Sequence, residues 1–404
     1  MSNFKYYVYR FLHDLIPIYP LYLLMFEKSG LKVAQISFLL AIWSIPGVIL
    51  EIPTGVLADR WNRRNMLLLG QLLKAGCYLV WIFADRFEIY AIGFVLWGIG
   101  GTFKSGSEEA LLYDSLKLVN QEKRFEQVLG RGRFLSGFST VLASLFGGFL
   151  GMRYGFTPVL LLSVFASLAG AAMVLTMKEV NLYKERLVKE RREEEERTLL
   201  GALSFVIKRK EVLLYSLLAL LVITTAGILD EYDQLIAESF GLSIALIGGW
   251  TAVRFILIAL GGFLASSIRR GTERLFHQGD RMIQVAILCC MAGGALLVAG
   301  LVRSIGVMAL YGLYYLIMAA ADVIHVDYIH QRIDAEGRST VHSLLSLCQN
   351  LYGIVCYSLF GWLVSEKDLF LGLIWTGVYI TLWTLVICIL YGNWRRKIRR
   401  NRLS

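Results

Sequence analysis

Charged side chains are scarce in this chain. They make up 18% of the 404 residues, while hydrophobic residues make up 56% and the mean hydropathy is +0.59. A soluble domain carries roughly 25% charged and about 45–50% apolar residues, so the composition argues against a soluble globular protein. The apolar excess lies in long runs of the length, about 20 residues, that a helix needs to cross a bilayer.

Cysteines are also few, and none of the six forms a CxxC pattern. All lie inside apolar runs, at Cys77, Cys289, Cys290, Cys348, Cys356 and Cys388. This placement predicts small buried apolar residues, with no disulfide framework and no metal site. The sequence has no Walker lysine motif, HExxH, GxSxG or metal-spaced histidine cluster. An ATP-driven pump or a soluble-type enzyme is therefore disfavoured, and no cofactor is expected.

The apolar runs predict twelve membrane-spanning helices. The expected ranges are 6–26, 34–57, 66–84, 89–116, 128–152, 157–177, 212–236, 243–268, 282–302, 305–329, 341–364 and 369–391. The first run contains His13 and Pro17 and no small-residue cleavage pattern follows it. We therefore expect a retained helix there rather than a cleaved signal peptide.

Lysine and arginine divide unequally between the two sides that these spans define. Thirty-two of the 41, among them Arg10 and Arg63, fall on the side of both termini, and six fall on the opposite side. Because short cytoplasmic loops are rich in lysine and arginine, both termini are predicted to be cytoplasmic and the protein to lie in the inner (plasma) membrane. The net charge of +10 then reflects topology, so nucleic acid is not an expected partner. The basic tail is expected to contact anionic lipid headgroups.

A charged segment divides the spans six and six. The predicted organisation is a bundle at 1–178, a cytoplasmic linker at 179–210 and a bundle with a basic tail at 211–404. Weak repeats support a duplication: GVLADRWNR at 55–63 and GFLASSIRR at 262–270 follow equivalent spans, and SLFG recurs at 144–147 and 358–361. The predicted fold class is an all-α integral membrane protein with two pseudo-symmetric six-helix bundles.

Residues 55–64 read GVLADRWNRR. They resemble the loop motif of the major facilitator superfamily, Gly-x-Leu-Ala-Asp-Arg-x-Gly-Arg-Arg/Lys, with Asn62 in place of a glycine. The resemblance implies a conformational latch formed by Gly55, Asp59, Arg60, Arg63 and Arg64. Glycine permits close helix approach, and Asp59 can cap the next helix. The arginines can reach carboxylates or helix C-termini of the other half. The alternative is an ordinary charged turn.

The run FKSGSEEALLYDSL at 103–116 is similar to bacterial drug-exporter-like members of that superfamily. Such proton antiporters usually have an arginine where this chain has Phe94. They also carry a Gly-Pro-x-x-Gly-Gly motif, where residues 143–148 read ASLFGG and lack the proline. Proton antiport is therefore an expectation of the resemblance, without its usual sequence marks.

Ionisable side chains within the spans are candidates for the transport pathway because each costs about 3 kcal/mol or more to place in the membrane. The predicted proton and substrate pathway comprises Asp14, Glu51, Lys104, Glu108, Arg254, Asp322 and His325. Arg254 lies deepest and requires a buried carboxylate or an anionic substrate. The superfamily resemblance implies that helices 1, 4, 7 and 10 line the central cavity. Structural roles stay open: Lys104 and Glu108 can neutralise each other, and His325 can be a hydrogen-bonded structural histidine.

Other polar and aromatic residues are expected to have less specific roles. Lys74 is expected to snorkel inward. The tryptophans are expected in packing or the lipid belt, although Trp43 or Trp97 can stack an amphipathic substrate. The remaining acidic residues are expected in a solvated outer rim (Asp230, Glu231, Asp233 and Glu238) or among headgroups (Glu109 and Asp114).

The sequence thus predicts a secondary active transporter that works by alternating access. The favoured reading is proton-coupled efflux of a small lipophilic or amphipathic compound by a monomer. The first alternative is a nutrient or metabolite importer, symporter or uniporter, since fold does not decide direction. A membrane enzyme, scramblase or sensor is a third reading, for which no clustered catalytic residues are found.

Overall fold

The computed structural model describes residues 3–105, 107–180, 204, 206–276, 279–330, 338–364 and 368–403. Side chains at 52, 55, 56, 58–60, 126, 329–346, 399 and 401–403 lie outside the description. The chain forms two compact units. The first comprises Met1–Arg191, Leu242–Val253 and Tyr357–Ser365, and the second comprises Arg192–Gly241, Arg254–Cys356 and Glu366–Ser404. The domain boundaries drawn from the sequence stay a prediction.

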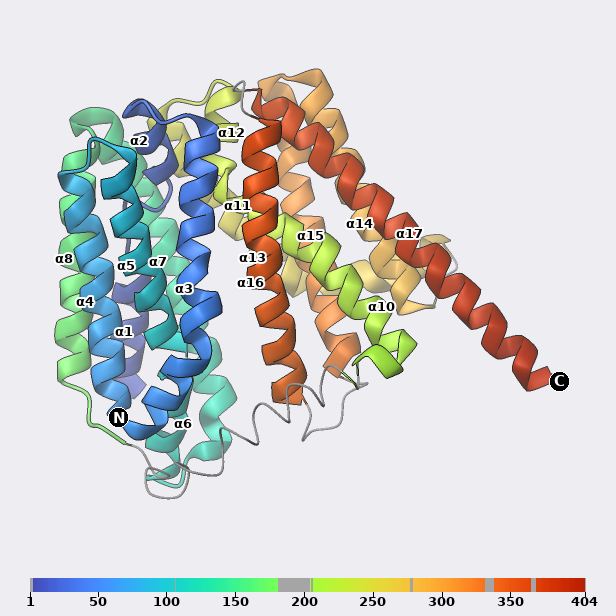
Figure 1. Ribbon diagram of the computed structural model, residues 1–404, viewed down its shortest axis with the longest axis horizontal. Coiled ribbons are helices and arrows are strands. Elements are labelled where there is room, and N and C mark those ends of the chain that lie inside the picture. Colours follow the sequence, from blue (N-terminus) through green and yellow to red (C-terminus); the bar gives the residue numbers. More distant parts are fainter. Residues whose placement is uncertain are drawn as a thin grey trace. The chain divides into compact units, whose positions relative to one another are not determined.

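Helices of the first unit follow one another with short connections (Figure 1). They are α1 (Asn3–Asp14), α2 (Tyr22–Lys28), α3 (Val33–Arg60), α4 (Arg63–Ile82), α5 (Phe87–Ser105), α6 (Glu108–Lys117), the 3-10 turn η1 (Glu122–Arg124), α7 (Phe125–Tyr154) and α8 (Phe156–Leu175). The helix α4 packs against α5 and α8, and α1 packs against α7 and α8.

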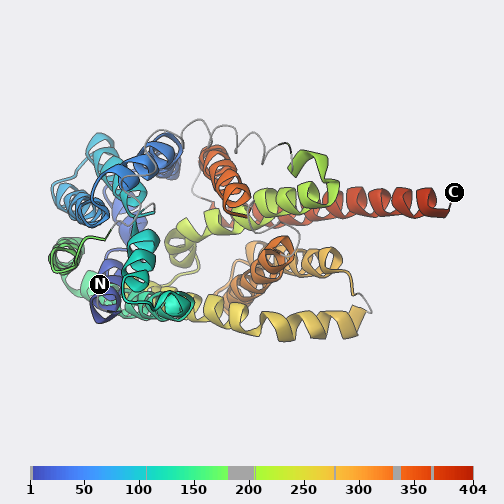
Figure 2. The ribbon, with the colours of Figure 1, turned by 90° about the horizontal axis from the view of Figure 1, so that it is seen from below.

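The regular elements among the described residues of the second unit are likewise all helical. Its elements are α10 (Lys210–Leu218), the π turn η2 (Ala219–Ile223), α11 (Thr224–Glu231), α12 (Asp233–Ser239), α13 (Ile244–Phe276, whose first residues belong to the first unit), α14 (Arg281–Val302), the 3-10 turn η3 (Ile305–Val307), α15 (Met308–His330), α16 (Arg338–Leu363, whose last residues belong to the first unit) and α17 (Leu369–Leu403). The helix α14 packs against α15 and α17. Figure 2 shows α17 as one continuous helix, which carries the basic tail beyond the predicted end of the last span.

Nine helices of the described residues are long and apolar enough to cross a membrane, and each matches a predicted span. The remaining predicted spans correspond to α1 with α2, to α5 with α6, and to α16. The predicted fold class, an all-α membrane protein with the twelve-helix arrangement, is confirmed. Since lipid gives helices no hydrophobic reason to associate, close packing relies on small residues. A Cβ on Gly70 of α4 would lie 2.9 Å from the carbonyl oxygen of Gly100 of α5, so these helices meet backbone to backbone.

Three predicted spans are not continuous helices. The first breaks between α1 and α2, which are separate dark-blue helices in Figure 1, because Pro17 and Pro20 cannot donate a backbone hydrogen bond. The fourth breaks between α5 and α6, and the seventh contains the π turn η2 and a break at Tyr232. Backbone left unpaired by such breaks is tolerated at membrane depth only where protein or water satisfies it. The breaks therefore mark where polar groups gather.

Candidate functional site

Side chains of the first unit satisfy the backbone freed at the first break. The hydroxyl of Ser139 donates to the carbonyl of Phe11 over 2.6 Å, and the ammonium of Lys74 donates to the carbonyl of His13 over 2.8 Å. The N–H of Ile18 donates to the hydroxyl of Ser163 over 3.1 Å. Lys74 is thus held inside the unit at the C-terminus of α1, where the helix dipole favours a cation. The sequence predicts that Lys74 snorkels inward; in the structure its side chain is buried and its ammonium is bonded to the carbonyl of His13.

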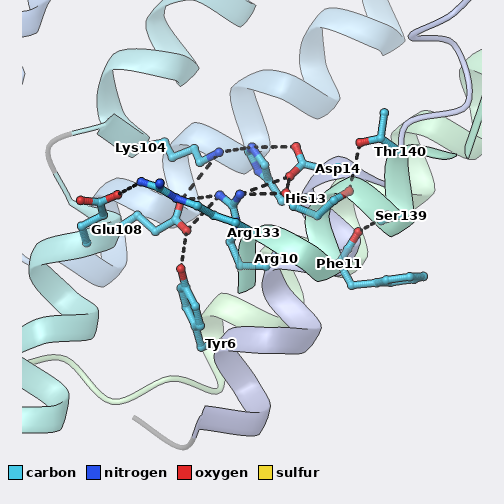
Figure 3. Close-up of polar contacts among 12 residues, drawn as sticks. Tyr6, Arg10, Phe11, His13, Asp14, Lys104, Glu108, Arg133, Ser139 and Thr140 are labelled. Atoms are coloured by element: carbon cyan, nitrogen blue, oxygen red, sulfur yellow. Dashed lines mark hydrogen bonds and ion pairs between the residues drawn. The ribbon is translucent and has the colours of Figure 1, made fainter. Parts of the chain in front are cut away.

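Glu108 is the centre of a buried charge cluster in the first unit (Figure 3). The Arg10 guanidinium donates through Nη1 to both carboxylate oxygens, at 3.0 and 3.1 Å, and the Tyr6 hydroxyl donates over 3.2 Å. Lys104 Nζ lies 3.6 Å from the same carboxylate. Because Glu108 opens α6, the dipole of that helix also favours its negative charge. Arg10, and not Lys104 alone, neutralises Glu108.

Asp14, the last residue of α1, joins the same cluster. It accepts a hydrogen bond from Ser136 of α7 and lies 3.7 Å from Nη2 of Arg10. Arg10 Nη2 also donates to the Ser136 hydroxyl over 2.8 Å. Arginine, serine and aspartate therefore form a closed set of contacts between α1 and α7. Arg10, which the sequence assigned to the cytoplasmic side, is instead part of the site.

His13 connects the two lysines of this cluster. Its Nε2 lies 2.9 Å from Lys104 Nζ, and its Nδ1 lies 2.5 Å from the side-chain amide of Gln71. An ammonium can only donate, so Nε2 must accept and the imidazole must carry its proton on Nδ1. The amide nitrogen of Gln71 faces Nδ1 and its buried oxygen has no partner, so a half-turn of the amide, which brings the oxygen to Nδ1, lets it accept that proton. His13 is then neutral and bridges Lys104 to α4.

A second buried cluster surrounds Arg254 of α13, in the second unit. Its guanidinium forms an ion pair with Asp230 and lies 3.5 Å, through Nε, from Oδ2 of Asp233. The Tyr315 hydroxyl donates to Asp233 over 3.2 Å, and the guanidinium lies 5.4 Å from the centre of the Tyr315 ring. Asp230 and Asp233 flank the break at Tyr232. The buried carboxylate that Arg254 was predicted to require is present.

The expected solvated rim is therefore wrong for part of the acidic group at 230–238. The side chain of Asp233 is 1% exposed and that of Asp230 26% exposed, against 3% for Arg254. The break at Tyr232 turns these carboxylates into the unit rather than toward solvent. The sequence pattern predicts an unbroken helix here, and it therefore gives no sign that Asp230 and Asp233 point into the unit.

The other predicted pathway residues lie outside these two clusters. Glu51 of α3 is exposed and accepts a hydrogen bond from the Ser105 hydroxyl over 2.9 Å. Asp322 of α15 is exposed, and no hydrogen bond or ion pair joins it to another described residue. His325 is buried and its Nε2 lies 2.8 Å from the carbonyl of Tyr215. This contact matches the structural alternative for His325.

The loop motif contributes a buried ion pair within the first unit. Arg63 Nη1 donates to Asp114 over 2.6 Å, and both side chains are buried. Asp114 therefore does not lie among headgroups, as expected from the sequence. Arg64 donates to the carbonyl of Met177, just beyond the C-terminus of α8. Gly55, Asp59 and Arg60 have side chains outside the described residues.

Glu179 caps the helix that follows this loop. Its two carboxylate oxygens accept the backbone N–H groups of Arg63 and Arg64 at 3.0 and 2.7 Å. Free N–H groups at a helix start attract a carboxylate, which is the role predicted for Asp59. The sequence did not indicate Glu179 because it lies 116 residues after Arg63.

The second unit repeats the ion pair in exposed form. Arg281 opens α14 as Arg63 opens α4, and it donates to Asp327 of α15 over 2.7 Å. Asp280 caps α14 by accepting the N–H of Met282 over 3.0 Å, and it also pairs with Arg395 of α17. These equivalent contacts agree with the weak sequence repeat between the two halves.

Sequence reasoning missed Tyr6, Arg10, His13 and Ser136 as members of the first cluster. Arg10, His13 and Asp14 are spaced by three and four residues, Tyr6 stands four residues before Arg10, and such spacing places side chains on one helix face. This polar stripe in the first apolar run was the available signal. Ser136 carries no comparable signal, because a serine in a membrane helix is common.

The chain matches the sequence profile of the Major Facilitator Superfamily over residues 6–356. It belongs to this family of membrane transporters. It is 22% identical over 378 residues to the uncharacterized MFS-type transporter YxaM of Bacillus subtilis (strain 168), which covers 93% of this chain and 90% of the relative. It is also 28% identical over 138 residues to the uncharacterized MFS-type transporter YfkF of the same organism. That alignment covers 34% of this chain and 32% of the relative.

Solved structures share the fold. The nucleoside transporter NupG aligns with a TM-score of 0.76 at 13% identity, covering 96% of this chain and 98% of that one. The POT family transporter PepTSo aligns with a TM-score of 0.70 at 11% identity, covering 98% and 99%. These structures show the fold alone; membership of the superfamily makes the chain a multi-pass membrane transporter of small molecules and not an enzyme.

Proposed function

We propose that this protein is a proton-coupled secondary transporter that exports a small lipophilic or amphipathic compound by alternating access. The observation that supports it best is Arg254, a buried arginine shared by Asp230 and Asp233. A shared arginine allows one carboxylate to be protonated while the other keeps the ion pair. Protonation would then loosen the contact between α13 and the broken helix α11–α12. The drug-exporter-like run at 103–116 supports export.

We propose that the cluster around Glu108 interacts with substrate, while the cluster around Arg254 takes up and releases the proton. Asp14, Lys104 and Glu108 lie at the two helix breaks of the first unit, where a small change in the backbone moves each charge. Discontinuous helices place transporter sites near the bilayer midplane. We further propose that both termini are cytoplasmic, that the protein works as a monomer in the inner membrane, and that the tail on α17 contacts anionic lipids.

Proton coupling is tested with the purified full chain in proteoliposomes that contain an internal pH dye. We expect compound-dependent proton flux opposite to the movement of an amphipathic substrate. An Asp230→Asn/Asp233→Asn variant is expected to lower that flux at least tenfold, or about 1.4 kcal/mol. Glu238→Gln in the same segment serves as the matched control and is expected to keep most of it.

Two outcomes would contradict the proposal. Proton flux in the same direction as the substrate would establish symport and support the importer alternative. Substrate movement without any proton flux would establish a uniporter or another coupling ion.

The loop at 55–64 is proposed as a conformational latch. Asp59→Asn is expected to slow transport roughly tenfold but to change the substrate dissociation constant less than twofold, because the loop holds a conformation and does not contact substrate. Transport and binding are measured with the compound found in the flux screen. Asp85→Asn is the control, since the Asp85 side chain is 82% exposed. Equal losses of binding and transport for Asp59→Asn would refute the latch.

A further inference from the structure

One face of α5 has open space at Gly101, between an aromatic and a charged side chain. Trp97, Gly101 and Lys104 are spaced by four and three residues and so lie on the same helix face. A Cβ on Gly101 would meet nothing within 4 Å, whereas a Cβ on Gly98 or Gly100 would meet backbone atoms within 3 Å. The helix is therefore tightly packed beside Gly101 and open at it.

This opening is not on the side that faces lipid. Ile92 stands nine residues before Gly101, which is half a turn around the helix axis, and its side chain is 54% exposed. Exposed apolar residues such as Ile92 mark the lipid side of a membrane helix. Phe94 and Tyr90 lie on the same side of the helix as Gly101, about two and three turns before it. Both are buried in the first unit. The space at Gly101 consequently opens on the polar, protein side of α5.

Positive charge exceeds negative charge at the Lys104 end of this face of α5. The cluster holds three cations (Arg10, Lys74 and Lys104) and two carboxylates (Asp14 and Glu108), with His13 neutral. Arg10 hydrogen bonds to Glu108, and Lys74 donates to the end of α1.

Lys104 is left with His13 at 2.9 Å and with Glu108 at 3.6 Å, beyond hydrogen-bonding distance. Its side chain is 26% exposed. The nearby carboxylate of Glu51 hydrogen bonds to Ser105, and Glu109 pairs with Arg133. Lys104 is thus the accessible cation.

Two tryptophans lie at the other end of this face. The rings of Trp97 and Trp43 lie 5.7 Å apart, and both side chains are half-buried. Trp97 stands seven residues before Lys104, which corresponds to about 10 Å along the helix axis. The face therefore offers an apolar aromatic surface and a cation separated by the length of a small amphipathic molecule.

We propose that this face binds an amphipathic carboxylate, with the carboxylate on Lys104 and the apolar body over Gly101 against Trp97 and Trp43. The inference rests on the proposed transport function and names its substrate class. A carboxylate on Lys104 balances the charges of the cluster and gains charge-assisted hydrogen bonds. A cationic amphiphile would add a fourth positive charge to the three already present.

The test is a binding measurement on the purified full chain, by thermal unfolding at increasing ligand concentration. The probes share one apolar body: 6-phenylhexanoate, 6-phenylhexanamide and 6-phenylhexylamine. We expect the carboxylate alone to raise the unfolding temperature. Lys104→Gln is expected to raise its dissociation constant about ten- to hundredfold, the range for a hydrogen bond to a charged group. Gly101→Leu, which fills the open space at Gly101, is expected to abolish the shift.

Matched controls are Lys123→Gln, on an exposed lysine, and Gly294→Leu, at a second-unit glycine that also has nothing within 4 Å. Both should bind the carboxylate as the unmodified chain does. Stabilisation by the amine or the amide, no stabilisation by the carboxylate, or full binding by Gly101→Leu would overturn the proposal. Because this experiment needs no proton gradient, its failure is distinguishable from a failure of proton coupling.

Discussion

Arg254→Met is expected to lower the free energy of unfolding by about 3–5 kcal/mol. The substitution removes the shared cation and leaves Asp230 and Asp233 together, with the Asp233 side chain only 1% exposed. Methionine keeps much of the arginine volume, so the loss reports charge rather than a cavity. Denaturant or thermal unfolding of the purified protein in detergent measures the change.

A second substitution separates charge from packing. Arg254→Met combined with Asp233→Asn should recover a large part of the lost stability, because the added change removes a stranded carboxylate. Arg303→Met is the control, since Arg303 and Asp368 form a pair with side chains 48% and 35% exposed. Such a surface pair contributes about 0–1 kcal/mol. Equal losses for Arg254→Met and Arg303→Met would show that Arg254 is not a buried anchor.

Glu108→Gln is expected to reduce substrate-driven proton flux at least tenfold, or about 1.4 kcal/mol in the barrier. Glu108 lies against two cations, Arg10 and Lys104, so its neutralisation leaves Arg10 with Asp14 alone and Lys104 without a carboxylate. Glutamine preserves the size of the side chain and one hydrogen-bond acceptor. The loss should therefore appear mainly in transport, measured in proteoliposomes with the internal pH dye.

Glu109→Gln is an unusually close control, because it makes the same change in charge one residue along α6. The Glu109 side chain is 55% exposed and pairs with Arg133, which is 67% exposed. We expect flux within about twofold of the unmodified chain, as an exposed pair contributes little. If both variants lose flux equally, the first cluster does not carry the transport mechanism.

Arg254 and Arg10 show which features of the site the sequence predicts and which it does not. Arg254 was identified because a single arginine in an apolar run is expensive, and its need for a carboxylate followed from the same argument. Its partners, however, were assigned to a solvated rim, since an unbroken helix would have placed them outside. The count of cytoplasmic lysines and arginines includes Arg10 but does not predict its partner; the helix α1 places it against Glu108.

The sequence by itself determined the membrane class, the helical fold, nearly all span positions and the family. The membrane class, the fold and the spans follow because an apolar run of about 20 residues is stable as a helix in lipid. The family follows from a contiguous motif. Only the tertiary structure decided which charges meet: Arg10 with Glu108, Arg63 with Asp114, and Arg254 with Asp230 and Asp233. The physical reason is that an ion pair depends on atoms a few ångströms apart. Residues far apart in the chain reach that distance only when helices pack and when breaks such as the one after Asp14 redirect them.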